Sequence, residues 1–166
     1  MFYESIFRQL NKYRVEYLVA GGVAVVLHGI VRFTADLDIF AKLSFENWDK
    51  FIRAMKELGY KAKLPVKLED FAEESKRKEW IAKKNMKVFS FYHPKKHLEL
   101  IDIFVKEYID FDAAYKRRKM VRAKDINIPV VCIKDLKKLK KIAGRPQDLA
   151  DIGSLEELER IEKGKK

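Results

Sequence analysis

Residues 21–39 have the sequence GGVAVVLHGIVRFTADLDI, and this stretch decides the fold. The short apolar run Val15–Ala20 precedes it, which predicts a strand that ends in a tight turn at the glycine pair. The apolar residues Val23–Leu27 then predict a helix, and residues 34–41 alternate around two aspartates as a strand does. We therefore expect a strand, a glycine turn, a helix and a second strand in direct succession.

The rest of the chain has the apolar periodicity of further helices and strands. Helices are predicted over residues 2–13, 44–59, 112–119 and 134–143, with a helical turn at Arg145-Pro146 and a last helix that starts at the Ser154–Glu157 capping box. Strands are predicted over residues 88–92 and 98–105, as an antiparallel hairpin, and over 126–133, where Pro129 indicates an edge position. Residues 67–84 are charged on most faces and fit either a helix or a mobile flap.

Length and composition predict one domain over residues 1–166. The chain has 36 Lys and Arg against 25 Asp and Glu, a net charge of +11, and 48% hydrophobic residues, enough for an ordinary core. The longest uncharged stretch, residues 17–31, is too short and too rich in glycine for a membrane helix, and no signal peptide is recognisable. We therefore expect a cytoplasmic protein without a membrane span. Abundant Lys and Glu with only two glutamines predict a heat-adapted source.

Nearly all of the excess positive charge lies in one third of the chain. Residues 116–145 contain twelve basic residues and two acidic ones, Asp125 and Asp135. Such a cluster attracts polyanions, so RNA or a nucleoside triphosphate (NTP) is a natural partner. A solvated basic surface would have the same composition.

Two aspartates in the second strand are the first candidates for chemistry. Asp36 and Asp38 are one residue apart, and because side chains alternate along a strand, both carboxylates point to the same face. Carboxylates so close repel each other unless a cation lies between them, and a hard divalent ion such as Mg²⁺ is the usual one. The Asp-x-Asp pattern also occurs in exposed turns, but Leu37, Ile39 and Phe40 place this pair in an apolar segment, which favours a metal site.

A third aspartate strengthens this hypothesis. Asp102 shares a strand face with Leu98, Leu100 and Phe104, where a carboxylate needs a cation or strong hydrogen-bond donors close by. A salt bridge to a core-facing Arg or Lys would meet the same need. If this strand lies beside that of Asp36, three carboxylates surround one site, and Asp102 is placed to act as a base toward an attacking hydroxyl.

The glycine pair is the third candidate. Gly21 and Gly22, between a strand and a helix, let backbone N–H groups approach an anion closely, and the helix dipole favours phosphate there. The same pair also makes an ordinary tight turn. Its position just before the strand of Asp36 favours phosphate binding.

The whole stretch 21–39, with its paired glycines, Arg32-x-Thr34 and Asp36-x-Asp38, resembles the core signature of the DNA polymerase beta-like nucleotidyltransferase superfamily. It is most similar to the small stand-alone prokaryotic branch related to abortive-infection nucleotidyltransferase toxins. Residues 136–152, with Lys140, Ala143-Gly144-Arg145-Pro146, Asp148 and Asp151, are similar to the C-terminal motif of that branch. In many members of the superfamily a serine follows or replaces the second glycine, but Gly22 and Val23 hold those places here.

The resemblance implies an α/β (α+β) nucleotidyltransferase fold, a twisted mixed β-sheet flanked by helices with a helical C-terminal segment. It also implies transfer of a nucleoside monophosphate from an NTP to a hydroxyl of RNA, tRNA or protein, dependent on Mg²⁺ or Mn²⁺. Asp36, Asp38 and Asp102 would be the metal ligands and catalytic acids.

The resemblance further assigns nucleotide contacts. Gly21 and Gly22 would contact phosphates. Arg32 and Thr34 would orient phosphates or the aspartates, or only fix the start of the strand. Lys140 would contact phosphate or substrate, or remain a solvated lysine. The rival hypothesis is a degenerate module of the same fold that binds RNA or a partner protein, for example within a toxin–antitoxin pair.

Overall fold

The structure is a computed structural model and describes residues 3–165. Its helices are α1 (Glu4–Lys12), α2 (Gly21–Leu27), α3 (Phe45–Glu57), the 3-10 helix η1 (Leu68–Ala72), α4 (Glu74–Lys84), α5 (Phe111–Lys116), α6 (Ile133–Ala143) and α7 (Pro146–Gly164). Its strands are β1 (Tyr17–Val19), β2 (Asp36–Ala41), β3 (Lys61–Ala62), β4 (Val88–His93), β5 (Lys96–Phe104), β6 (Lys119–Ala123) and β7 (Ile126–Val130).

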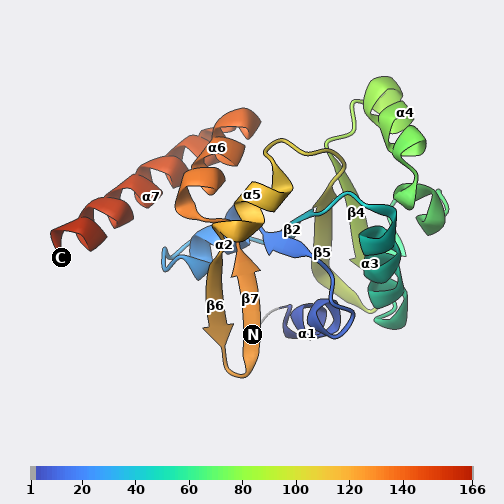
Figure 1. The fold of residues 1–166 in the computed structure, drawn as a ribbon, viewed down its shortest axis with the longest axis horizontal. Coiled ribbons are helices and arrows are strands. Elements are labelled where there is room, and N and C mark those ends of the chain that lie inside the picture. The colour runs from blue at the N-terminus through green and yellow to red at the C-terminus, as the bar shows by residue number, and fades with distance from the viewer. Residues whose placement is uncertain (1–2, 166) are drawn as a thin grey trace.

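All seven strands of the described residues form one mixed sheet in the order β3-β4-β5-β2-β1-β7-β6. Figure 1 shows this sheet with helices on both sides. The pairs β2–β5 and β1–β7 are parallel, and the other neighbours are antiparallel. The predicted mixed sheet with flanking helices is therefore confirmed, as is the antiparallel β4–β5 hairpin.

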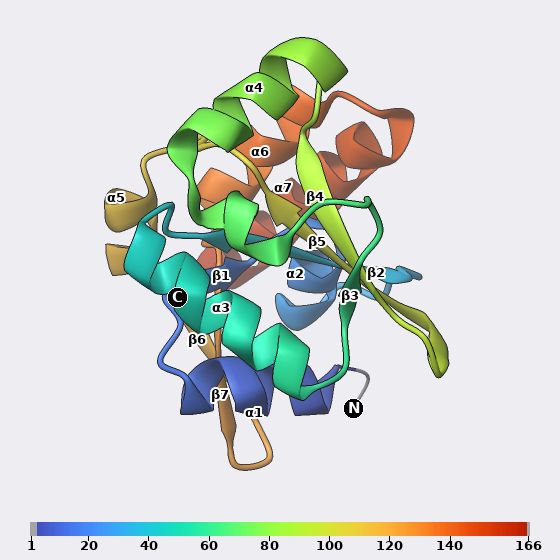
Figure 2. The same cartoon turned by 90° about the vertical axis from the view of Figure 1, so that its right-hand side faces the viewer.

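Helices cover both faces of the sheet. On one face, α1, α3 and α4 lie together in front of the strands (Figure 2), and the aromatic residues of α3 are buried there. Phe51 of α3 contacts Phe91 of β4, with ring centroids 5.4 Å apart. On the other face, Phe111 of α5 contacts Phe40 of β2 at 5.3 Å, and α6 and α7 lie beyond it (Figure 1). The predicted apolar stripe of α3 thus packs into the core on the first face of the sheet. The aspartates lie on the opposite face.

Local signals set several element boundaries. The Ser44 hydroxyl accepts a hydrogen bond from the Asn47 amide and begins α3, as predicted. The first helix begins at Glu4, two residues later than expected, and Phe2 lies outside the described residues. The helix predicted from Val23 already begins at Gly21, and the strand predicted from Thr34 begins at Asp36. Residues 67–84 are helical, as η1 and α4.

The prediction of an edge strand at Pro129 was wrong. Residues 119–123, the end of the helix predicted over 112–119 and the residues after it, form the outer strand β6, so β7 lies between β6 and β1. The parallel ladder to β1 is confined to Val19 opposite Val130, where the Val131 amide donates to the Val19 carbonyl. This short ladder does not need an N–H group on Pro129, so the proline is tolerated inside the sheet.

The C-terminal segment is one helix instead of a helical turn followed by a second helix. Pro146 occupies its first turn, and Arg145 with Asp148 forms a capping box at its start. Ser154, predicted as an N-cap, lies within α7, where its hydroxyl donates to the Ala150 carbonyl. Over residues 3–165, no helix combines the length and the apolar character needed to cross a bilayer.

Candidate active site

Parallel pairing of β2 and β5 brings the predicted carboxylates together. Asp38 lies directly opposite Asp102, and Asp36 lies opposite Leu100, two residues away on the same face. The condition set by the sequence, that the two strands be neighbours, is therefore met. Three carboxylates share the face that α6 covers.

The absence of a side chain at Gly21 leaves room for the Asp38 side chain. A Cβ atom on Gly21 would overlap the Asp38 carboxylate and would lie 2.8 Å from the Asp38 Cβ atom. Gly21 also has φ +59°, a left-handed conformation that favours glycine. The first glycine of the pair therefore lets a carboxylate lie against the start of α2.

Burial and mutual repulsion change the acidity of the carboxylates. Burial, followed by the negative charge of Asp102, raises the pKa of Asp38 to about 6. Burial also raises the pKa of Asp102, although a hydrogen bond from the Ser90 hydroxyl, 2.5 Å from its Oδ1, opposes this effect. Among residues 3–165, no Lys or Arg forms an ion pair with Asp102, so the salt-bridge alternative does not hold. Ser90 on β4 was not predicted, because only the hairpin register places it opposite Asp102.

The donor set suits a hard divalent cation. Asp36, Asp38 and Asp102 offer only carboxylate oxygens, which Mg²⁺ and Mn²⁺ prefer. Burial and, after it, the charge of Asp102 raise the pKa of Asp38, and a bound cation would favour its ionised form. As the side chains stand, no three of the described His, Cys, Asp and Glu residues converge as a complete ligand set. The carboxylate oxygens of these residues are thus suitable ligands for a cation. Its binding would draw the carboxylates closer together.

A cavity of about 260 Å³ lies between these carboxylates and the last two helices. Gly21, Asp38 and Asp102 line it from the sheet side, and Lys140 and Arg145 line it from the helix side. Carboxylate and cationic side chains thus face the same space. The C-terminal motif recognised in the sequence is folded back onto the N-terminal one.

Gly22 has a different role from Gly21. A Cβ atom there would overlap the Arg32 guanidinium and the Thr34 hydroxyl, and would lie 2.8 Å from the Thr34 Cβ atom. Arg32 Nε also forms an ion pair with Asp151 of α7, at 2.9 Å. The absence of a side chain at position 22 therefore lets Arg32 and Thr34 pack against the turn, and this links the start of β2 to α7.

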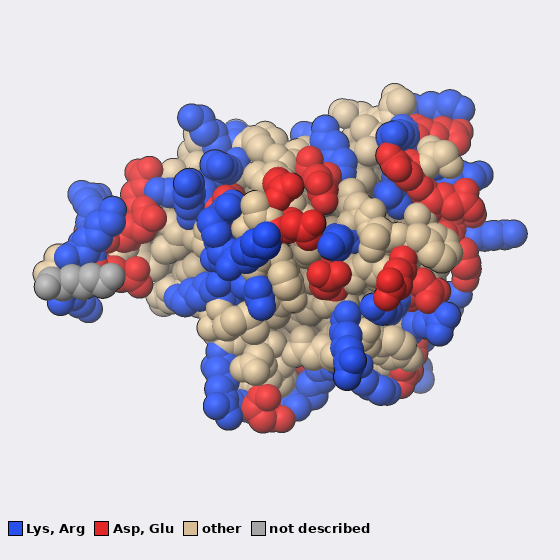
Figure 3. All heavy atoms as spheres, viewed as in Figure 1, with Lys and Arg blue, Asp and Glu red and all other residues tan. Residues whose placement is uncertain are grey.

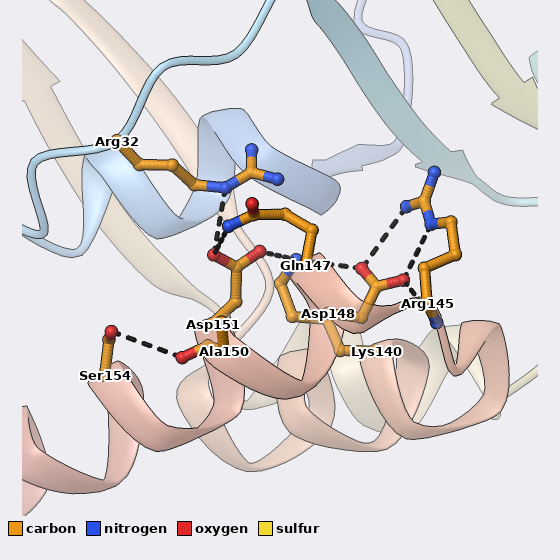
Figure 4. Close-up of polar contacts among 8 residues, drawn as sticks. All are labelled: Arg32, Lys140, Arg145, Gln147, Asp148, Ala150, Asp151 and Ser154. Atoms are coloured by element: carbon orange, nitrogen blue, oxygen red, sulfur yellow. Dashed lines mark hydrogen bonds and ion pairs between the residues drawn. The ribbon is translucent and has the colours of Figure 1, made fainter.

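Lys140 lies in a buried network of charges between α6 and α7 (Figure 4). Its Nζ atom is 2.6 Å from Asp151 and 3.4 Å from Asp148, and the residue is only 3% exposed. Arg145 Nε in turn lies 2.7 Å from Asp148. The alternative of a solvated lysine is therefore wrong. Asp148 and Asp151 carry this network, a role that the sequence motif alone did not assign.

Comparison with known proteins agrees with this arrangement at the level of the fold. No family model matches the chain, and no curated protein sequence is significantly similar to it. Solved structures do match. The lincomycin-bound lincosamide antibiotic adenylyltransferase LnuA is 18% identical with a TM-score of 0.58, covering 92% of this chain and 93% of its own.

Two further structures have similar values. ANT(2")-Ia in complex with adenylyl-2"-tobramycin is 11% identical with a TM-score of 0.53, and the match covers 97% of this chain and 94% of that one. A protein from Thermotoga maritima described as a "putative nucleotidyltransferase" is 16% identical with a TM-score of 0.52, and the match covers 95% of this chain and 86% of that one. The chain therefore has the polymerase beta-like nucleotidyltransferase fold that the sequence signature predicted.

Proposed function

We propose that the protein is a nucleotidyltransferase that transfers a nucleoside monophosphate from an NTP to a hydroxyl group, with Mg²⁺ or Mn²⁺ as cofactor. The observation that carries the proposal is the register of β2 and β5, which aligns Asp38 with Asp102 and puts Asp36 on the same face. This face opens onto a cavity that also contains cationic side chains. The nucleotidyltransferase fold supports this class of reaction.

The proposed mechanism assigns each group a step. Asp36, Asp38 and Asp102 would hold the cation, which supplies charge neutralisation for the triphosphate when bound. Asp102 accepts the proton of the acceptor hydroxyl. The hydroxyl oxygen forms a bond to the α-phosphorus while the bond to the β-phosphate oxygen breaks, and pyrophosphate leaves in line.

The remaining predicted contacts orient the nucleotide. Backbone amides of Gly21 and Gly22 lie at the start of α2, where anions are favoured. Arg32 and Thr34 pack on this turn, and Lys140 lies in the cavity wall. We propose that they position the phosphates, with Arg32 and Lys140 held in place by Asp151.

The acceptor that we propose is RNA, including tRNA, or a protein. LnuA is described as a lincosamide antibiotic adenylyltransferase, so the fold also accommodates small acceptors. In this chain the basic segment 116–145 favours an acidic polymer. The proposal includes a single domain, a cytoplasmic location, where NTPs are abundant, and a relation to the abortive-infection branch.

A second candidate function is a catalytically degenerate module that binds RNA or a partner protein, as one half of a toxin–antitoxin pair. Gly22 in place of a serine favours it, and so does an exposed apolar cluster next to the signature motif. Val31, Phe33 and Leu98 are 102%, 92% and 77% exposed, and Phe33 and Leu98 line an apolar cavity of about 450 Å³. Exposed apolar groups of this kind mark interaction surfaces.

One experiment separates the two functions. Each α-labelled NTP is incubated with Mg²⁺ and total RNA or protein extract, using the wild type and the Asp36→Asn, Asp38→Asn double variant. A variant with Asp49→Asn and Asp125→Asn, two aspartates in surface ion pairs, controls for the loss of charge. We expect label transfer by the wild type and the control alone, and the labelled fraction identifies the acceptor. No transfer by a folded wild type, with a working positive control, would favour the binding module.

A further inference from the structure

Some basic residues of the segment 116–145 are neutralised by ion pairs, and others can bind an anion. Five of its twelve basic residues are neutralised by ion pairs, namely Arg117 with Asp135, Lys124 with Glu4, Lys137 with Glu159, Lys140 with Asp151 and Arg145 with Asp148. The other seven form no ion pair with any described residue. Lys and Arg side chains gather on the face shown in Figure 3, over the region of α5, α6 and β6.

Three of these unpaired lysines follow one side of α6. Lys134, Lys138 and Lys141 are spaced i, i+4 and i+7, so they share one face of the helix, and all three are exposed. Leu136 and Leu139 point the other way, into the catalytic cavity. α6 therefore separates the catalytic site from a row of free cations.

A second cavity, of about 620 Å³, lies beside this row. Tyr108, Ile109 and Ile142 give it apolar walls, and Lys138 and Lys141 lie along its α6 side. A cavity of this size accommodates a small ligand such as one nucleotide. Its composition combines apolar surface for a base with cations for a phosphate.

The acidic residues of this cavity are already engaged. Arg117 donates two parallel hydrogen bonds to Asp135, from Nε to Oδ2 at 3.2 Å and from Nη2 to Oδ1 at 3.1 Å, and Asp135 is fully buried. The Asp110 carboxylate caps α5 by accepting a hydrogen bond from the Ala113 amide at 2.6 Å. Lys138 and Lys141 therefore remain as the cations of this cavity that have no counter-ion among residues 3–165.

The two cavities are separated by a pair of aromatic rings. Phe104, at the end of β5, lines the catalytic cavity, two residues after Asp102. Its ring centroid is 5.7 Å from that of Tyr108, which lines the second cavity. A flexible polymer bound at the catalytic carboxylates can pass over the ring of Phe104. It then reaches Tyr108 and the lysines of the second cavity.

We propose that the second cavity binds one nucleotide of a single-stranded RNA acceptor. Lys138 and Lys141 contact its phosphate, and the base lies against Tyr108 and Ile142. A single strand is favoured over a duplex, because only an unstacked base can enter a cavity of this size. The inference rests on the proposed function, since it supplies the path by which an RNA acceptor reaches Asp102.

Binding is tested without NTP or metal, so that the result does not depend on turnover. A fluorescent single-stranded RNA of about 12 nucleotides is titrated by anisotropy at several salt concentrations. The test variant is Lys138→Ala with Lys141→Ala. The matched control is Lys163→Ala with Lys165→Ala, two exposed lysines at the far end of α7 with the same change in charge.

The salt dependence gives the first readout. The loss of contact with one phosphate makes the slope of log K against log salt shallower by about 0.7, so the test variant should show this change and the control nearly none. An unchanged slope for the test variant, or an equal loss in both variants, would overturn the proposed subsite.

The ring of Tyr108 gives the second readout. Tyr108→Leu should weaken binding by fivefold or more, while Tyr108→Phe retains the ring and should bind like the wild type. Melting curves of both variants check that the fold is kept. Two results together would refute the nucleotide subsite. One is that both Tyr108 variants bind RNA like the wild type. The other is that heparin binding depends on Lys138 and Lys141 as strongly as RNA binding does, because the surface would then recognise charge alone. If the subsite variants lose RNA binding while the wild type transfers no label, the binding inference stands and the proposed catalysis fails.

Discussion

Replacement of Asp38 by Asn should stabilise the protein at neutral pH while it abolishes nucleotidyl transfer. The pKa of Asp38 is raised from 3.8 to about 6 in the folded protein, first by burial and then by Asp102. Each pKa unit corresponds to 1.36 kcal/mol, so ionised Asp38 destabilises the folded state by about 3 kcal/mol. An asparagine carries no charge and avoids this cost.

The sign of the pH dependence follows from the raised pKa. Below pH 4 the carboxyl is protonated in both the folded and the unfolded chain, so the wild type suffers no penalty. Between pH 4 and 6 the unfolded chain ionises while folded Asp38 keeps its proton, and above pH 6 the penalty is complete. The stability advantage of Asp38→Asn over the wild type should therefore grow from near zero at pH 4 to its full value at pH 8.

Thermal and urea unfolding in EDTA at pH 4, 6 and 8 measure this difference. For a chain of this size, 3 kcal/mol corresponds to an increase of about 6–12 °C in melting temperature. Asp49→Asn, at an exposed ion pair, serves as control and should give no such increase. Added Mg²⁺ at pH 8 should stabilise the wild type more than Asp38→Asn. If the variant melts at or below the wild-type temperature at pH 8 without metal, the repulsion argument is refuted.

Three further predictions follow from the packing and the composition. Gly22→Ser should destabilise the protein by about 1–3 kcal/mol in urea unfolding, because its side chain would collide with Thr34, whereas Gly153→Ser has no neighbour within 4 Å and should cost little. Lys140→Met should destabilise it by about 3 kcal/mol in the same assay, since two buried carboxylates lose a partner, and an unchanged midpoint would contradict the network. The wild type should melt above about 60 °C in calorimetry, as expected of a heat-adapted protein, and a lower value would count against that source.

The sequence predicts the part of the site that depends on local periodicity. Asp36 and Asp38 share a face because side chains alternate along any strand, and Asp102 could be assigned a face in the same way. Whether the two faces coincide depends on the pairing of β2 with β5, which joins residues far apart in the chain. Local patterns do not encode that pairing. The sequence therefore predicts a shared site only on the condition that the strands of Asp36 and Asp102 are neighbours.

Other features depend on long-range partners. Lys140 is on the flank of an amphipathic helix, and only the sharp reversal at Gly144, with φ +67°, brings α7 and its carboxylates to it. None of the residues of strand β6 is fully buried, and pairing with β7 orders it. The helix predicted over residues 112–119 was therefore too long, because Lys119 already belongs to the sheet.

The ion pairs of α7 also affect when the cavity beside the three aspartates is completed during protein synthesis. Arg32 is made early, but its partner Asp151 belongs to α7, which is synthesised much later. Lys140 likewise has no buried counter-ion until α7 has folded onto α6. A nascent chain thus carries Asp36, Asp38 and Asp102 without a finished cavity until α7 has been made and has folded. For an enzyme that acts on RNA, this order would keep the growing chain inactive while it is surrounded by ribosomal and messenger RNA.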